Sequence, residues 1–234
     1  MPLIGSIIFN AFFYLSLIPI TAIILSLYFF ISTENLQRIA AIWIKVVLNA
    51  LKFFCGIHWK IEGVENIPNT PCIVVSNHQG QWESFFLQTL FFPSTSIIKK
   101  ELLYIPLFGW ALRCMKPITL NRLNKVGSLK KVIKKGVIKL KNGFTIILFP
   151  EGTRISPEKG IQPFAGSCGL LSIKSGLPIL PICHNSGKYW KNKKFIKSPG
   201  KVVLRIGKPI VGNDPKVVTN DAYNWVKNNY KEIN

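Results

Sequence analysis

The stretch Cys72-Ile73-Val74-Val75-Ser76-Asn77-His78-Gln79-Gly80-Gln81-Trp82-Glu83 decides the fold, because two kinds of local pattern meet in it. Residues 72–76 form a short apolar run rich in β-branched side chains, which is typical of a buried strand. From residue 81 the chain becomes helix-like and continues through Phe85, Phe86 and Leu87. A strand, a short polar loop and a helix in this order are the repeating unit of an α/β domain.

The spacing of His78 and Glu83 is informative, since the chain contains only 3 His residues. Residues five apart in one regular helix lie on different faces, because each residue advances ~100°. The two side chains can meet only if His78 precedes the helix, with Gly80 as N-cap and Glu83 reaching back from the first turn. Glu83 would then bind one ring nitrogen and leave the other to accept a proton. The alternative is a Glu at a helix start beside an unrelated surface His, and the spacing alone does not decide between them.

The alternation of strand-like and helix-like patterns extends over most of the chain. Short apolar runs predict strands at 58–61, 72–76, 96–99, 117–120, 145–149, 179–183 and 202–206. Helical patterns lie at 81–92, 125–141, 166–174 and 216–231. The sequence therefore predicts an α/β fold with a mixed, largely parallel sheet flanked by helices.

The N-terminal segment Ser6–Ile31 contains no charged residue. It is about long enough for a bilayer-crossing helix, which needs roughly 20 residues. No Lys or Arg precedes Arg38 and no cleavage site stands out, so a secretory signal is not indicated. The basic excess follows this segment, which predicts a cytoplasmic location for the rest of the chain. A hairpin in one leaflet, with a kink at Pro19, and a buried core helix are the alternatives.

A second N-terminal segment, Leu36–Phe54, is amphipathic. Arg38, Lys45, Asn49 and Lys52 interrupt its apolar residues at near-helical spacing. Such a helix lies in a membrane interface or packs on a globular domain, and the pattern favours neither. We therefore expect N-terminal membrane-anchoring helices within residues 1–55 and an α/β domain within residues 56–234.

The charge balance points to an acidic partner. The chain has 30 Lys and Arg and 10 Asp and Glu, which gives a net charge of +20, and 48% of its residues are hydrophobic. A mean hydropathy of +0.28 is high for a soluble nucleic-acid binder and favours an anionic membrane surface. No nucleic-acid motif accompanies the charge. The basic, aromatic-bearing segment Lys188–Lys201 is expected to meet lipid headgroups or to be a solvated loop.

The cysteine content excludes two classes of site. The chain has 5 Cys and no CxxC pair. The cysteines are widely spaced and lie in apolar stretches of sequence: Cys55, Cys72, Cys114, Cys168 and Cys183. Neither a zinc site nor a disulfide framework is supported, and buried reduced thiols are the simplest interpretation.

Polar, chemically capable residues follow four of the predicted strands. They are Asn77 and His78, then Lys99, Lys100 and Glu101, then Asn121 and Arg122, and finally Glu151, Gly152, Thr153 and Arg154. If these strands run parallel, their carboxyl ends share one edge of the sheet, where ligands bind in open α/β folds. A His, carboxylates and several cations on one edge suit a substrate that bears both a reactive hydroxyl and a phosphate.

The segment Phe149-Pro150-Glu151-Gly152-Thr153-Arg154 combines a strand end, a Pro and a Gly that lets the backbone approach a ligand. The planar fork of Arg154 suits the oxygens of a phosphate. Taken alone, this segment is better interpreted as an ordinary turn, and Arg122 could be a solvated surface residue.

Together these motifs resemble the glycerolipid acyltransferase family, and within it the lysophosphatidic acid acyltransferases. Asn77-His78-X4-Glu83 resembles the first family block, NHX4D, and Phe149–Arg154 is the third block, FPEGTR. The second block, KxEL…P…G…I…DR, resembles Lys99–Leu102 with Pro106, Gly109 and residues 117–122, and the fourth resembles Pro178–Ile182. The resemblance spans residues 57–209 and rests on four blocks in order.

Two residues depart from the family pattern. Glu83 replaces the common Asp, as in a bacterial branch, and its longer side chain must still reach His78. Asn121 replaces the Asp that usually precedes Arg122. His184 follows the fourth block without a carboxylate at the partner spacing, so we expect a structural or peripheral role for it.

The resemblance implies transfer of a fatty acyl group from acyl-CoA or acyl-carrier-protein to the 2-hydroxyl of 1-acyl-glycerol 3-phosphate, giving phosphatidic acid. It implies that His78, oriented by Glu83, is the general base. The implied substrate-binding residues are Lys99, Lys100, Arg122, Glu151, Gly152, Thr153 and Arg154. No cofactor, metal or covalent acyl-enzyme is implied, and the expected location is a bacterial-type inner (cytoplasmic) membrane.

Three alternatives stay open from the sequence. The acceptor could be another lysophospholipid or glycerol 3-phosphate, because only the acceptor pocket would differ. The chain could instead be a basic module that binds a membrane or nucleic acid without catalysis.

Overall fold

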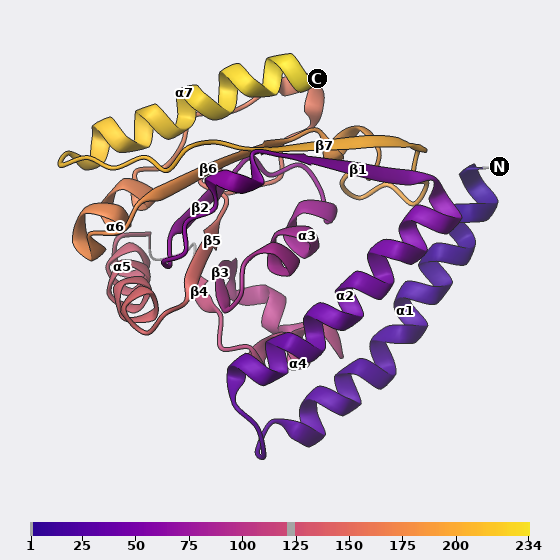
Figure 1. Ribbon diagram of the computed structural model, residues 1–234. Coiled ribbons are helices and arrows are strands. Elements are labelled where there is room, and N and C mark those ends of the chain that lie inside the picture. Colours follow the sequence, from indigo (N-terminus) through magenta and orange to yellow (C-terminus); the bar gives the residue numbers. More distant parts are fainter. Residues whose placement is uncertain (1, 121–124) are drawn as a thin grey trace.

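The computed structural model describes residues 2–120 and 125–234 of the chain. These residues form a seven-stranded sheet in the order β1-β7-β6-β2-β5-β3-β4 (Figure 1). The strands are β1 Ile57–Glu62, β2 Ile73–Ser76, β3 Ser94–Lys99, β4 Ile118–Leu120, β5 Thr145–Leu148, β6 Ile179–His184 and β7 Gly200–Ile206. Each strand predicted from the sequence is present, with ends that shift by up to two residues.

The sheet is mixed and largely parallel. Strands β6 and β7 run antiparallel, whereas β1 with β7, β6 with β2, β2 with β5, β5 with β3 and β3 with β4 run parallel. The prediction of the fold class is therefore confirmed. All four residues of β2 are buried, as expected for a parallel strand covered on both faces.

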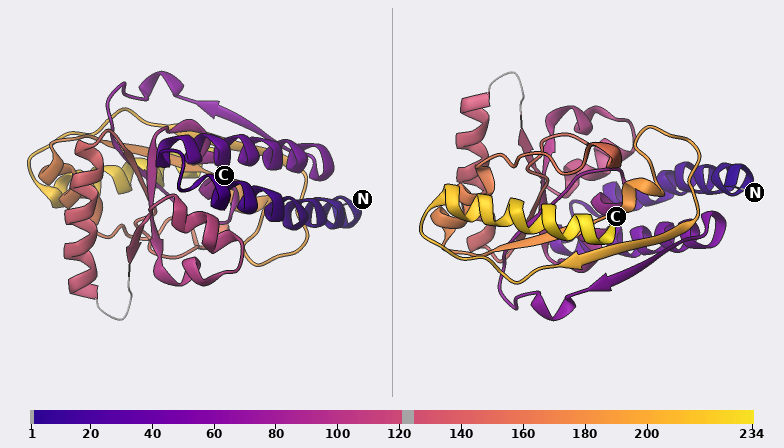
Figure 2. Two further views of the ribbon diagram at one scale, coloured as in Figure 1. Left: turned by 90° about the horizontal axis from the view of Figure 1, so that it is seen from below. Right: turned by 90° about the horizontal axis from the view of Figure 1, so that it is seen from above.

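Helices cover both faces of the sheet (Figure 2). They are α1 Pro2–Leu27, α2 Thr33–Cys55, α3 Trp82–Leu90, α4 Phe108–Cys114, α5 Lys125–Lys141, α6 Ser167–Ser175 and α7 Pro215–Ile233. Val74 of β2 belongs to the hydrophobic cluster under α2 and α3, whereas Ile73 and Val75 belong to the cluster under α5, α6 and α7. The sheet thus separates two cores, each formed by alternate strand residues.

Several short elements were not predicted. These are α4 and the 3₁₀ helices η1 Val64–Asn66, η2 Lys100–Tyr104, η3 Pro157–Lys159 and η4 Ser186–Lys188. The helix ends, by contrast, carry ordinary signals. Ser32 caps α2 by accepting a hydrogen bond from Asn35 N, and Gly56 ends it at φ 64°. The 5 Cys residues are all buried free thiols.

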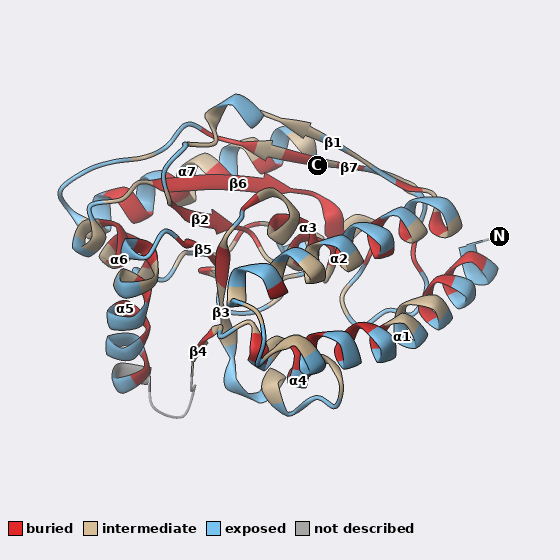
Figure 3. Ribbon diagram, turned by 60° about the horizontal axis from the view of Figure 1, so that its bottom comes forward, coloured by how far each residue is buried: buried red, intermediate tan, exposed pale blue. Residues whose placement is uncertain are grey.

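Helices α1 and α2 form a hairpin beside the sheet (Figure 1). Within the described residues, α1 alone is long and apolar enough to cross a membrane, and 28% of its most apolar stretch is buried. Val47 and Leu51 of α2 are fully buried in the core under α3. The opposite side of α2 is exposed (Figure 3). It carries Arg38, Lys45, Asn49 and Lys52 together with the apolar Ile42 and Phe53, so one face packs on the domain and the other is exposed and largely polar.

The start of α1 is joined to the basic segment 188–201 through Lys197. The Lys197 ammonium donates to Asn10 Oδ1 at 2.5 Å and to Phe195 O at 2.8 Å, and Lys197 N donates to Ser6 Oγ at 2.9 Å. Burial lowers the pKa of Lys197 to about 8. Lys197 therefore faces α1, although we expected this segment to face lipid or solvent throughout.

Candidate active site

The polar residues that follow the central strands meet at one edge of the sheet. Strands β6, β2, β5 and β3 are neighbours and run parallel, so their carboxyl ends share this edge. His78 follows β2, Glu151 and Arg154 follow β5, and Ser186 follows β6. Lys99 ends β3 and is exposed at the same edge. The strand order thus brings together residues that lie more than 100 positions apart in the sequence.

His78 and Glu83 form the contact expected from their spacing. His78 Nδ1 lies 2.8 Å from Glu83 Oε1, and the Glu83 side chain is 0% exposed while that of His78 is 16% exposed. The N-cap of α3 is Gln81, one residue later than the predicted Gly80, which makes Glu83 the second helical residue. The loop after β2 curls back over the helix start, so the longer carboxylate still reaches the imidazole.

Four hydrogen bonds hold the Glu83 carboxylate. Oε1 accepts from His78 Nδ1, from Gln79 N at 2.8 Å and from Gly80 N at 2.7 Å, and Oε2 accepts from Ser186 Oγ at 2.9 Å. Burial alone would raise the pKa of Glu83, but the hydrogen bonds from His78 and from the Gly80 N–H hold that pKa well below its usual range. Glu83 is therefore ionised, and His78 donates its Nδ1 proton to it. The lone pair of His78 is then on Nε2.

The loop after β5 fixes the rest of His78. Phe149 stacks on the imidazole with ring centres 4.1 Å apart and planes at 14°. His78 N donates to Glu151 Oε2 at 2.7 Å, and His78 O accepts from Ile155 N at 2.7 Å. The ring and both main-chain polar groups of His78 therefore have defined partners.

The Glu151 carboxylate accepts hydrogen bonds from main-chain N–H groups. Its second oxygen accepts from Gln162 N at 3.0 Å, so the carboxylate joins the loop after β2 to the loop after β5. Burial raises the pKa of Glu151 to about 7; the charge of Glu83 adds to this shift, and the two N–H donors oppose it. Glu151 thus titrates near neutral pH, whereas Glu83 does not.

Arg154, one of the predicted anion-binding residues, contacts the loop between His78 and Glu83. Its Nε donates to Gly80 O at 2.7 Å, and burial lowers its pKa while the charge of Glu83 raises it. Gly152 and Thr153 are exposed in the same loop, with Gly152 at φ 69°. Lys100 is exposed at the start of η2. Arg122 lies outside the described residues.

Position 80 requires a glycine for packing. A Cβ at Gly80 would lie 2.5 Å from Trp190 O, which is main chain and cannot move aside. The loop after β6 therefore closes directly onto the loop that bears His78.

Sequence reasoning missed a group of residues behind Glu83. Asn77 Nδ2 donates to His184 O at 2.9 Å, and His184 N donates to Asn77 Oδ1 at 3.1 Å. The His184 ring lies beside Ser186, whose hydroxyl reaches Glu83. No local spacing predicts this arrangement, since 103 residues separate Glu83 from Ser186. The available signal was the polar run His184-Asn185-Ser186-Gly187 at the end of a fully buried strand.

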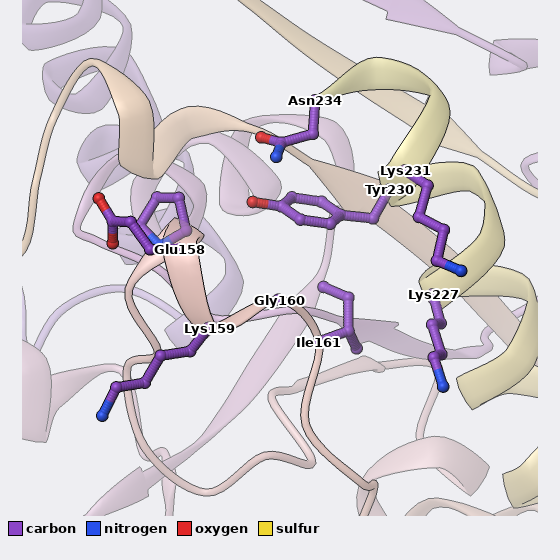
Figure 4. Close-up of a pocket in the computed structure, with 9 residues that line it drawn as sticks. Glu158, Lys159, Gly160, Ile161, Lys227, Tyr230, Lys231 and Asn234 are labelled. Atoms are coloured by element: carbon purple, nitrogen blue, oxygen red, sulfur yellow. The ribbon is translucent and has the colours of Figure 1, made fainter.

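A pocket of about 410 Å³ lies between the loop after β5 and the end of α7 (Figure 4). Its lining residues are Pro157, Glu158, Lys159, Gly160, Ile161, Lys227, Tyr230, Lys231 and Asn234. Tyr230 OH accepts a hydrogen bond from Gln79 Nε2 at 2.7 Å, so this pocket lies behind the residue that follows His78. Its lining does not include the predicted site residues of the described chain.

The fold and this edge define an α/β protein in which a His–carboxylate pair lies beside cations. A family model described as Acyltransferase matches residues 58–185. The 1-acyl-sn-glycerol-3-phosphate acyltransferase of Pseudomonas aeruginosa is 38% identical over 196 residues, which cover 82% of this chain and 76% of the relative. The chain therefore belongs to the acyltransferase family and is an enzyme of that family.

Two further comparisons agree with this assignment. A chloroplastic 1-acyl-sn-glycerol-3-phosphate acyltransferase of Brassica napus, BAT2, is 32% identical over 71% of this chain, which spans 49% of that relative. The crystal structure of the 1-acyl-sn-glycerophosphate (LPA) acyltransferase PlsC from Thermotoga maritima superposes with a TM-score of 0.78 at 26% identity. That comparison covers 97% of this chain and 94% of the other.

Proposed function

We propose that the protein transfers a fatty acyl group from an acyl thioester to the 2-hydroxyl of 1-acyl-glycerol 3-phosphate, giving phosphatidic acid. The donor is acyl-CoA or acyl-carrier-protein. The observation that carries the proposal is the 2.8 Å contact between His78 Nδ1 and the buried Glu83, with Arg154 at the same sheet edge. The names of the relatives support the choice of acceptor.

The proton transfers follow from the assignment of the His78 nitrogens. Nε2 takes the proton of the acceptor hydroxyl while the oxygen attacks the thioester carbonyl carbon. The resulting imidazolium is balanced by the ionised Glu83. As the tetrahedral intermediate collapses, the C–S bond breaks and Nε2 returns the proton to the leaving sulfur. Help of this kind is worth ~10²–10⁴-fold in rate.

The acceptor phosphate is held by cations at the same edge. Arg154 uses Nε on Gly80 O, which fixes the plane of its guanidinium and directs the fork. Lys99 and Lys100 add positive charge from the end of β3, and we assign Arg122 to the same role from the sequence. Glu151, Gly152 and Thr153 shape the loop that carries Arg154.

Residues 1–55 anchor this site at a membrane in our proposal. The exposed side of α1 carries large apolar residues: Leu3, Ile4, Ile7, Ile8, Tyr14, Leu15, Ile18 and Ile23. Such a surface favours contact with lipid over water. The exposed Lys191, Lys193 and Lys194 follow η4 and favour anionic headgroups. We place the enzyme on the cytoplasmic side of a bacterial-type inner membrane, with no nucleic acid as partner.

The decisive experiment assays the purified protein against several acceptors with both thioester donors. The acceptors are 1-acyl-glycerol 3-phosphate, a lysophospholipid with a larger headgroup, and glycerol 3-phosphate. We expect the first to be acylated most efficiently and His78→Ala to lose about 10³-fold in kcat. The matched control is His58→Ala, which changes an exposed His on β1 and keeps full activity. Faster acylation of glycerol 3-phosphate would contradict the acceptor, and normal turnover by His78→Ala would contradict the base.

A further inference from the structure

We propose that Ser186, supported by His184, is a positioning residue that orients Glu83 toward His78. The inference rests on the proposed role of His78 and extends it to a layer of side chains behind the reacting atoms. Ser186 and His184 are 1% and 0% exposed, so neither reaches solvent, and we do not assign either to contact with substrate.

The protons of the His184 ring can be assigned from its partners. Nε2 lies 2.9 Å from Asn77 O, and a carbonyl oxygen only accepts, so Nε2 carries a proton. Nδ1 accepts from Ser186 N at 3.3 Å, which requires a lone pair there. Burial lowers the pKa of His184, which agrees with a neutral ring. His184 therefore has one donor and one acceptor nitrogen, and both are used.

This assignment leaves the Ser186 hydroxyl proton for Glu83. Ser186 Oγ lies 2.9 Å from Glu83 Oε2 and 3.0 Å from His184 Nδ1, and it has a single proton to donate. Since Nδ1 already accepts from Ser186 N, the hydroxyl is free to donate to the carboxylate. A hydrogen bond to an ionised acceptor is also the stronger of the two.

The two oxygens of Glu83 consequently have separate tasks. Oε1 takes its three donors from the loop after β2, including the imidazole of His78. Oε2 takes its donor from η4, after β6. Within the described chain, Ser186 is the donor that faces Oε2, so without it a buried carboxylate oxygen lacks a partner. The carboxylate would then rotate or hold its charge less well when His78 becomes an imidazolium.

The series of hydrogen bonds from Glu83 through Ser186 and His184 ends at the sheet. Asn77 and His184 exchange two hydrogen bonds through main-chain and amide groups, where β2 and β6 run side by side with Ser76 opposite Ile182. His184 is thus fixed relative to the strand that delivers His78. Ser186 transmits this fixed position to Glu83 through one hydroxyl.

A double-mutant cycle tests the proposal. We expect Ser186→Ala to lower kcat about tenfold, because a hydrogen bond to a charged group is worth roughly that factor, and to leave both KM values within about twofold. In a Glu83→Gln background, Ser186→Ala should change kcat by less than about twofold, since Ser186 acts through the carboxylate. The matched control is Ser172→Ala in α6. It removes a buried hydroxyl that donates to Leu177 O at 2.8 Å, and it should keep full kcat.

Two results would overturn the positioning role. One is a Ser186→Ala enzyme with normal kcat, and the other is an equal loss of kcat in the wild-type and Glu83→Gln backgrounds. His78→Ala, measured in parallel, separates the two proposals, because an active His78→Ala enzyme contradicts the general base itself. If Ser186→Ala does not fold, Ser186→Cys keeps a side chain with a weak donor and should lose kcat severalfold. Normal kcat in Ser186→Cys would then count against the proposal.

Discussion

Two regions of the molecule bury a charged side chain, and they treat it differently. At the sheet edge, Glu83 is fully buried and has four hydrogen bonds, two of them from main-chain N–H groups. At the junction of α1 with the loop before β7, Lys197 is 2% exposed and its ammonium has two neutral oxygens as partners. Three aromatic rings also lie within 6 Å of the Lys197 ammonium.

The difference shows what keeps a buried charge ionised. Burial disfavours the charged form of both groups, and only enough aligned partners reverse that effect. Glu83 has them, so its pKa falls despite burial. Lys197 has fewer, and its pKa falls to about 8, toward the neutral form. The first region holds its carboxylate in the charged form, while in the second an amine joins two segments of the chain.

The largest expected effect comes from removing the Glu83 charge. Glu83→Gln keeps the shape but turns one oxygen into an amide that faces N–H or O–H donors, so we expect kcat to fall about 10²-fold. The measurement is steady-state kinetics with saturating donor. Glu62→Gln, in a surface ion pair on β1, is the control and should keep normal kcat. Normal turnover by Glu83→Gln would remove the contrast between the two buried charges.

The next effect concerns Arg154, which lies beside the Glu83 loop. Arg154→Ala removes the fork assigned to the acceptor phosphate, so we expect the acceptor KM to rise about tenfold and the donor KM to change little. Arg205→Ala, in an ion pair with Glu62, is the control. Equal changes in both KM values would show that Arg154 holds the loop and not the phosphate.

Glu151 is intermediate between the two buried charges, because its pKa is raised from 4.5 to about 7. The folded protein binds the Glu151 proton more tightly than the unfolded chain does. The stability that this difference contributes is fully present below pH 4.5 and is lost as the pH rises through 7. Between pH 5 and pH 8.5, we expect the Tm of the wild type to fall on the order of 5 °C further than the Tm of Glu151→Gln. We also expect Glu151→Gln to lower kcat severalfold, since one N–H loses its acceptor. Parallel Tm curves for the two proteins would contradict the assigned ionisation.

The smallest effect is expected at Lys197. Its folded pKa of about 8 lies below the ordinary 10.5, so the unfolded chain binds more protons between these values and stability rises with pH there. Lys197→Met should abolish this rise, keep kcat within about twofold and shift Tm by only about 3 °C at pH 7. Thermal melts at pH 7 and pH 9.5 measure it, with the exposed Lys194→Met as control. A large loss of kcat would show that the α1 junction affects the active site.

Most of the fold was predictable because the strands carry strong local signals. The runs 72–76 and 145–149 are continuous and β-branched, and α5 and α7 have clear helical periodicity. Helix α4 was missed, since it is short and its residues between Pro106 and Pro117 show no clear period. The packing of one face of α2 on the domain could not be chosen from the pattern, because an interfacial helix has the same amphipathic pattern.

The geometry of the candidate site was predictable where it depends on residues that are neighbours in the sequence. The spacing and the change from strand to helix allowed the contact of His78 with Glu83, and the neighbouring family motifs favoured it. The contacts of Glu151 with His78 N and of Ser186 with Glu83 did not follow, because they depend on strand order. His184 was expected to be structural or peripheral, and it is a buried structural residue. Its approach to Glu83 through Ser186 could not be predicted, for the same reason.

The main-chain contacts around His78 and Glu83 bear on attempts to build such a centre elsewhere. Gln79 N and Gly80 N hold the carboxylate, and the two main-chain groups of His78 bond Glu151 and Ile155. Copying an HX4E sequence onto another scaffold would therefore transfer the side chains without the peptide groups that aim them. The smallest transplantable unit is three loops in a fixed mutual arrangement, at 77–83, 149–155 and 184–187.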